Sequence, residues 1–307
     1  MDLSTSAPDR CAEWVSAQSV DPIGSAGRYD AFMLIEHPLP WPADLEELVE
    51  IGADLPDPAR LPARTRMLLV VPRPDAADRL VTWWKREEAH HFVGTEVRVP
   101  PGAVLEAAHA LANGDDVVGT EPAPPELLIC THGRRDRCCG SAGTRLVNSL
   151  ADARLPVRVR RCSHTGGHRF APTGLSLPEG RFWAGLDAAV AAAIATRTGD
   201  PVALHRHQRG SSSLVPWAQV LERACLERFG WEWLHWTIEG VGVDERAAER
   251  GAMVEIVASS PSGRTVRAEA WIEVGRDLAV PACSAGPGAV KTAVEYRLDG
   301  VRWAPPG

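Results

Sequence analysis

Cysteine and histidine residues gather in two short stretches of the chain, at spacings that suit one metal centre. The first stretch, CTHGRRDRCC, begins at Cys130 and ends at Cys139, and the second, HTGGH, runs from His164 to His168. The whole chain has 307 residues, with 7 cysteines and 10 histidines. Two thiolates and two imidazoles can fill four coordination positions, and both ligand types bind zinc and iron. We therefore predict a metal site built from these two stretches.

The spacing excludes two common cysteine motifs. No C-x-x-C pair occurs in the chain, so neither a zinc ribbon nor a thioredoxin-type dithiol is present. The first stretch has a C-x8-C pattern instead, and the second has an H-x3-H pattern with Gly166 and Gly167 inside it. Glycine adopts positive φ and lets the backbone approach a ligand closely. We expect loops that close on a bulky group.

The strings CTHGRRDRCCG and RCSHTGGHRFA resemble the sucrase/ferredoxin-like family, whose relevant module is similar to thioredoxin-like 2Fe-2S ferredoxins. A weaker echo of the family, QRGS, follows later in the chain. In family members with a bishistidinyl cluster, the ligands are the first and last cysteines of C-x8-C and both histidines of H-x3-H. The resemblance thus implies that Cys130, Cys139, His164 and His168 bind a 2Fe-2S cluster. Cys138 falls outside this ligand set.

A cluster held in this way would carry less negative charge than one held by four cysteines. Two thiolates neutralise the charge of the oxidised cluster, so replacing thiolates by imidazoles raises the reduction potential. A ligating imidazole also keeps a second nitrogen, which would couple electron gain to proton gain at His164 and His168. We expect an electron carrier or a redox sensor more than a stand-alone enzyme.

Three other interpretations of the sequence stay open. A structural Cys2His2 zinc site would fill all four tetrahedral positions and would have no redox chemistry. A thiol oxidoreductase would use Cys138 or Cys162. A glycosidase, which the family description suggests, needs two carboxylates across a sugar, and the sequence singles out no such pair.

Six arginines lie near the predicted ligands, although the chain has a net charge of -7. A positive collar of this kind would attract an acidic redox partner, and salt would weaken that attraction. A solvated polar face would carry the same residues. The collar consists of Arg134, Arg135, Arg137, Arg160, Arg161 and Arg169.

Composition limits the location and the partners. An odd number of cysteines, without the pattern of a secretory signal, argues against a disulfide framework and predicts a cytoplasmic protein. The longest apolar runs, residues 67–71 and 188–195, are too short to span a membrane. Basic stretches with interleaved aromatic residues are absent from the sequence, so we expect no nucleic-acid partner.

The predicted elements place both ligand stretches directly after strands. A strand at residues 126–130 leads into the first stretch, a helix follows at 144–153, and a strand at 157–162 leads into the second. A hairpin at 174–184 and a helix at 186–197 complete a β-α-β-β-α order, which is typical of a thioredoxin-like module. Both ligand stretches should then meet at one end of the sheet.

The whole chain is predicted to be an α/β protein of three parts. These are an N-terminal α/β unit at residues 1–120, a thioredoxin-like 2Fe-2S ferredoxin domain at 121–240, and a C-terminal antiparallel β extension at 241–307. The other predicted strands are 29–36, 67–72, 253–258, 265–274 and 292–298, and the other predicted helices are 104–112 and 216–229.

Overall fold

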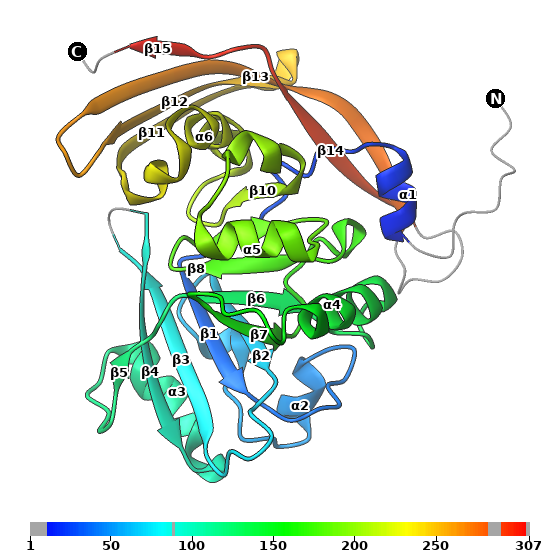
Figure 1. Ribbon diagram of the computed structural model, residues 1–307, viewed down its shortest axis with the longest axis vertical. Coiled ribbons are helices and arrows are strands. Elements are labelled where there is room, and N and C mark those ends of the chain that lie inside the picture. The colour runs from blue at the N-terminus through cyan, green and yellow to red at the C-terminus, as the bar shows by residue number, and fades with distance from the viewer. Residues whose placement is uncertain (1–10, 88–89, 282–289, 305–307) are drawn as a thin grey trace, which may run out of the picture.

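A computed structural model describes residues 11–87, 90–281 and 290–304 of the chain. A sheet of ten strands forms the centre, and a second sheet of five antiparallel strands lies at one end (Figure 1). The predicted α/β class with a C-terminal antiparallel extension is confirmed. Among the described residues, no helix is both long enough and apolar enough to cross a membrane.

The large sheet draws its strands from both sides of the predicted boundary at residue 120. Strands β1 and β2 are parallel, as are β6 and β7, and the other neighbouring strands are antiparallel. The two halves meet where Val70 of β2 pairs with Cys162 of β7. The division into parts at 1–120, 121–240 and 241–307 stays a prediction. In sheet order the strands are β10 (Gln208–Ser211), β9 (Arg181–Trp183), β8 (Gly174–Leu177), β6 (Glu126–Cys130), β7 (Arg158–Cys162), β2 (Thr65–Val70), β1 (Ala31–Glu36), β3 (Arg79–Arg86), β4 (Phe92–Val99) and β5 (Glu121–Pro122).

The second sheet curves over the helix α6 (Pro216–Phe229) (Figure 1). Leu221 and Cys225 of this helix are fully buried against Ile256 and its neighbours in the sheet. The alternation of apolar and polar residues along these strands is what allows one face to be buried and the other to face solvent. The strands are β11 (Thr237–Arg246), β12 (Gly251–Ser259), β13 (Thr265–Pro281), β14 (Val290–Leu298) and β15 (Arg302–Ala304).

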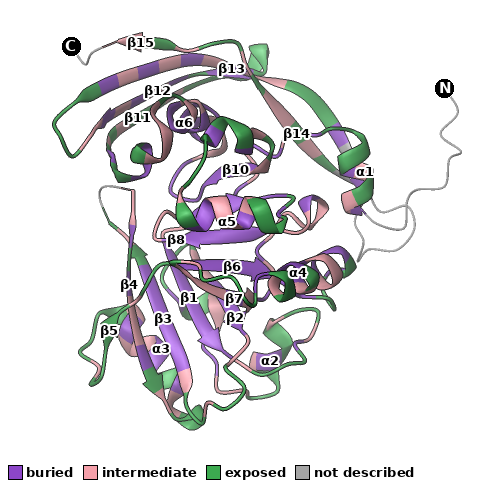
Figure 2. Ribbon diagram, in the orientation of Figure 1, coloured by how far each residue is buried: buried purple, intermediate pink, exposed green. Residues whose placement is uncertain are grey.

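Helices cover the large sheet and bury its strands (Figure 2). Leu146 of α4 and Ile194 of α5 belong to one apolar cluster with Leu127 and Ile129 of β6. A second cluster joins α2 and α3 to β1, β2 and β3. The remaining helices are α1 (Cys11–Ala17), α2 (Glu46–Glu50), α3 (Val104–Asn113), α4 (Arg137–Ser149) and α5 (Ala188–Thr196). Short 3-10 helices occur at Pro58–Arg60, Pro101–Ala103, His168–Phe170, Pro201–His207, Gly230–His235 and Ala247–Glu249.

One element that positions the site begins earlier than the sequence suggested. Helix α4 starts at Arg137, seven residues before the predicted start at 144. Asp136 is its N-cap, and its Oδ1 atom accepts hydrogen bonds from the amides of Cys138 (2.8 Å) and Cys139 (3.1 Å). An aspartate at this position satisfies amides that the first turn of a helix leaves unpaired. Both adjacent cysteines are therefore held in a rigid helical turn.

Candidate metal centre

Three of the four predicted ligands come together at the carboxyl ends of the neighbouring strands β6 and β7. Cys130 ends β6, Cys139 lies in the first turn of α4, and His164 lies in the loop after β7. Because β6 and β7 are parallel and pair at Cys130 and Cys162, the loops that follow them emerge side by side. The ligand atoms of Cys130, Cys139 and His164 all lie within 4.8 Å of one another. This is a compact soft-ligand group.

His168, the fourth predicted ligand, lies beside this group and has other partners. Its ring centroid is 6.0 Å from that of His164. Its Nδ1 atom lies 2.8 Å from Oδ2 of Asp136 and 3.1 Å from Sγ of Cys11. The structure thus gathers Cys130, Cys139 and His164, and connects His168 to residues that the sequence did not single out.

Glycines let the first ligand loop pack closely on the sheet. A Cβ atom at Gly143 of α4 would overlap the carbonyl oxygen of Cys130, and one at Gly140 would overlap the backbone of Gly133. The helix therefore approaches the end of β6 more closely than any other residue type at these positions would allow. This contact brings Cys139 against Cys130.

The HTGGH loop is held by two buried contacts. Gly166 and Gly167 have positive φ angles of 79° and 66°, as predicted. The guanidinium of Arg209 donates a hydrogen bond to the carbonyl of Gly166 at 3.0 Å, and a side chain at Gly167 would overlap that guanidinium. The hydroxyls of Thr165 and Thr173 lie 2.9 Å apart beneath the loop. These contacts fix the position of His164.

A hydrogen bond joins the two buried cysteines and moves their pKa values in opposite directions. Hydrogen bonding from the Cys139 thiol, opposed by burial and helped by the His164 ring, lowers the pKa of Cys130 well below its ordinary value. The hydrogen bond to Cys130, its burial and the negative charge on Cys130 raise the pKa of Cys139 well above its ordinary value. Together the pair favours a thiolate at Cys130, which is the form that binds metal.

A buried cation faces these thiols. Burial lowers the pKa of Arg209 to about 10, and negative charge on Cys139 and Cys130 opposes that shift. Among the described residues its hydrogen bonds go to oxygens of Ser25 and Gly166, and no carboxylate pairs with it. A buried charge without a counter-ion is costly. Negative charge at the cysteine group would offset part of that cost.

The six arginines of the predicted collar differ in exposure. Arg160 is buried and its Nε atom donates to Oε2 of Glu126 at 2.7 Å. Its charge is neutralised within the sheet, so it does not belong to a surface collar. The exposed members are Arg134, Arg135 and Arg137, and the half-buried members are Arg161 and Arg169.

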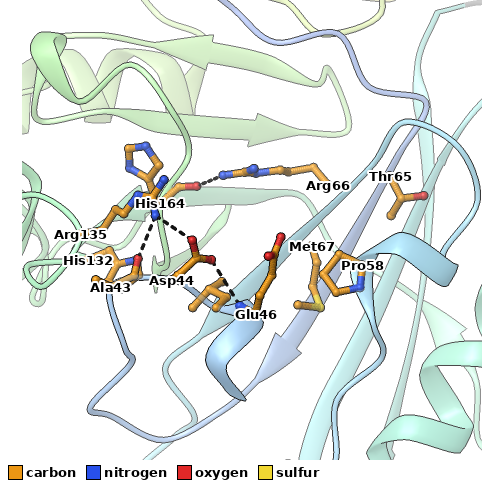
Figure 3. A pocket seen from close by; sticks show the side chains of 11 residues that line it. Ala43, Asp44, Glu46, Pro58, Thr65, Arg66, Met67, His132, Arg135 and His164 are labelled. Carbon is orange, nitrogen blue, oxygen red and sulfur yellow. Dashed lines mark hydrogen bonds and ion pairs between the residues drawn. The ribbon is translucent and has the colours of Figure 1, made fainter. Parts of the chain in front are cut away.

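A cavity of about 290 Å³ lies beside the group (Figure 3). His132 and His164 line one side of it, and Arg66 donates a hydrogen bond to the carbonyl of His164. Arg135 and Asp44 also line it and are joined by an ion pair of 3.3 Å. His164 is the half-buried member of the group, and this cavity reaches it.

Several residues of the site carried no strong sequence signal. Cys11 is far from the motifs in the chain, so spacing could not connect it to them. Asp136 stands three residues before Cys139, at a position where a capping residue could have been recognised. Cys162, which was considered as a reactive thiol, is fully buried in an apolar cluster, and burial raises its pKa well above the ordinary value.

The fold and the donor set define an α/β protein with a candidate cysteine and histidine metal centre. The chain belongs to the sucrase/ferredoxin-like family, whose model matches residues 22–210. That span includes the four predicted ligands, whereas Cys11 and the C-terminal sheet lie outside it. Comparisons with curated proteins and with solved structures gave no match.

Proposed function

We propose that this protein binds a 2Fe-2S cluster through Cys130, Cys139, His164 and His168, and that it carries electrons or senses redox state in the cytoplasm. The observation that carries the proposal is the buried group of Cys130, Cys139 and His164 in a member of this family. When bound, the cluster would supply one-electron chemistry. The protein would supply the ligands, their orientation and the surrounding charge.

The donor atoms of these residues are of the types that bind a 2Fe-2S cluster. Thiolates with imidazoles are an established ligand combination for 2Fe-2S clusters. The Nδ1 atom of His164 is buried and has no hydrogen-bond partner among the described residues. Buried polar atoms are rarely left unpaired, so an unpaired imidazole nitrogen beside two cysteines supports a ligand role. Arg209 would offset negative charge on the thiolates.

His168 would take part through its other nitrogen. Its Nδ1 atom is engaged with Asp136, which leaves Nε2 for a ligand. A carboxylate that accepts a hydrogen bond from the distal nitrogen of a ligating histidine fixes the ring orientation. Asp136 would hence orient His168, while its other oxygen caps α4 and orients Cys139.

The arrangement of the surrounding strands supports the proposal of a thioredoxin-like ferredoxin module. Strands β7, β6, β8 and β9 are neighbours in that order, with one parallel pair followed by two antiparallel pairs. Helices α4 and α5 pack on this part of the sheet. The element order is β-α-β-β-β-α, because the predicted hairpin contributes two strands, which the predicted string counted as one. The ligand loops follow its two parallel strands.

Exchange of a histidine for a cysteine tests this function. His164→Cys and His168→Cys should each retain iron and sulfide, shift the visible absorption and lower the midpoint potential, because a thiolate adds negative charge. His109→Cys in α3, remote from the site, is the matched control and should leave the absorption and the potential unchanged. Unchanged absorption and potential in both site variants would show that these histidines are not ligands.

The compactness of the group favours a second candidate, a mononuclear zinc site. Donor atoms within 4.8 Å of one another are close enough to surround one ion. A protein of this kind would be colourless and would have no redox signal. Its Cys139→Ala variant would lose zinc and stability together.

A further inference from the structure

A second group of buried donor atoms lies beside the first. It consists of Cys11, Asp136 and Cys138, whose ligand atoms all lie within 4.8 Å of one another. These residues are 2%, 3% and 3% exposed, so the group is closed to bulk solvent. None of these three residues belongs to the ligand set predicted for the cluster.

The fold brings these residues together from distant parts of the chain. Cys11 is the first residue of α1, and it lies 127 residues before Cys138 in the sequence. Its Sγ atom is 3.9 Å from Sγ of Cys138 and 3.1 Å from Nδ1 of His168. Nδ1 of His168 is 2.8 Å from Oδ2 of Asp136. Cys11, Asp136 and Cys138 thus surround one point, and His168 lies beside them in contact with Cys11 and Asp136.

Adjacent cysteines in α4 serve the two groups separately. Successive residues of a helix point about 100° apart, so Cys138 and Cys139 face different directions. Cys139 joins Cys130 and His164, whereas Cys138 joins Cys11. The doublet of cysteines is thereby explained by two neighbouring sites on either side of the first turn of α4.

We propose that Cys11, Asp136 and Cys138 bind a divalent cation of the zinc class, and that His168 lies outside this ligand set. Zinc takes thiolate, imidazole and carboxylate ligands in tetrahedral sites. A Zn–S bond of about 2.3 Å places two thiolate ligands about 3.8 Å apart in a tetrahedron, close to the 3.9 Å between these sulfur atoms. Thiols must lose their protons to bind zinc, so binding would release protons from Cys11 and Cys138.

The charges around the group suit a dication. Two thiolates and one carboxylate would exceed the charge of the ion by one unit, and cationic Arg169 lies near Cys11. Burial lowers the pKa of Arg169, and negative charge on Cys11 opposes that shift. The amides at the start of α4 add positive potential at Asp136. Because Cys11 begins α1 and Cys138 lies in the first turn of α4, the bound cation would pin α1 to α4.

The proposed cation site does not depend on the cluster. The two sites contain different chemical species, zinc in the cation site and iron with sulfide in the cluster site, so each can be measured separately. We would measure zinc, iron and acid-labile sulfide in the full-length wild type and in Cys11→Ala, with Cys225→Ala as a control at a buried cysteine in α6. The wild type should contain about one zinc per chain. Cys11→Ala should lose the zinc and keep whatever iron and sulfide the wild type has, and Cys225→Ala should keep all three. Zinc retained in Cys11→Ala, or a wild type without zinc, would overturn the proposal.

Cobalt provides a second measurement in case Cys11→Ala does not fold. A chain with Cys130→Ala and Cys139→Ala lacks both cysteines of the first group. Added Co²⁺ should then give the thiolate charge-transfer band and the strong visible bands of a tetrahedral site, and Cys11→Ala in the same background should abolish them. Absence of the thiolate band from the double variant would refute the site. Iron and sulfide missing from the wild type would refute the cluster alone.

Discussion

Gly143→Ala is a direct test of the packing that forms the candidate centre. In an ordinary helix, replacing glycine by alanine stabilises by about 1 kcal/mol. Here the new Cβ atom would overlap the carbonyl oxygen of Cys130, which is backbone at the end of a buried strand and cannot rotate away. Overpacking costs about 1–3 kcal/mol, and we take the upper value because the obstacle is rigid. The net expectation is a loss of about 2 kcal/mol in the free energy of unfolding.

Urea denaturation of the wild type, Gly143→Ala and Gly102→Ala measures this difference. Gly102 is a suitable control because it lies in a 3-10 helix and a Cβ atom there would meet no atom within 4 Å. Gly102→Ala should unfold at the wild-type midpoint or slightly above it. Gly143→Ala should also bind less metal, since α4 must shift away from Cys130. A Gly143→Ala protein as stable as the wild type would refute the reasoning.

Two other predictions concern buried or paired charges. Hydrogen bonds to Asp21 and Glu227 raise the pKa of His205 from 6.5 to about 9, so its contribution to stability is fully present below pH 6.5 and is lost as the pH rises through 9. His205→Gln should therefore be less stable than the wild type at pH 6 and equal to it at pH 10; a pH-independent difference in urea midpoint would contradict this. Arg209→Met leaves buried carbonyls without a donor and should cost about 2–4 kcal/mol of unfolding free energy, with a lower midpoint potential of any bound cluster. Wild-type stability of that variant would show that the buried cation is unimportant.

Local sequence patterns predicted the elements around the site well. The strands expected at 126–130 and 157–162 are β6 and β7: β6 has a central apolar run, β7 is a short run of valine and arginine that ends at Cys162, and each leads into a ligand loop. The start of α4 was misplaced because the sequence at 137–143 is rich in glycine, cysteine and serine, which have low helix propensity. The cap at Asp136 and the burial of the first turn override that propensity.

Long-range pairing could not be predicted in the same way. The strands β3 and β4, at 79–86 and 92–99, were not recognised: β3 begins and ends with charged residues and β4 contains Glu96 and Arg98, although β3 is buried along most of its length. The contact between Val70 and Cys162 that joins the two halves of the sheet has no local signature. The register of such pairs depends on the packing of the whole domain.

The residues of the candidate site also fall into two kinds: those that the sequence indicated and those that only the fold brings together. Spacing and resemblance indicated Cys130, Cys139 and His164, and the structure brings these three together. The contact of His168 with Cys11 joins residues 157 positions apart, which no motif could reveal. Only the fold, which places α1 beside the HTGGH loop, shows that Cys11 lies close to the predicted ligands.

Quantification of iron, zinc and acid-labile sulfide in anaerobically purified protein, followed by EPR after dithionite reduction, tests the central claim most directly. The account predicts about two iron and two sulfide per chain, together with a rhombic S = 1/2 signal after reduction. Colourless protein that lacks iron and sulfide even after anaerobic reconstitution would contradict it.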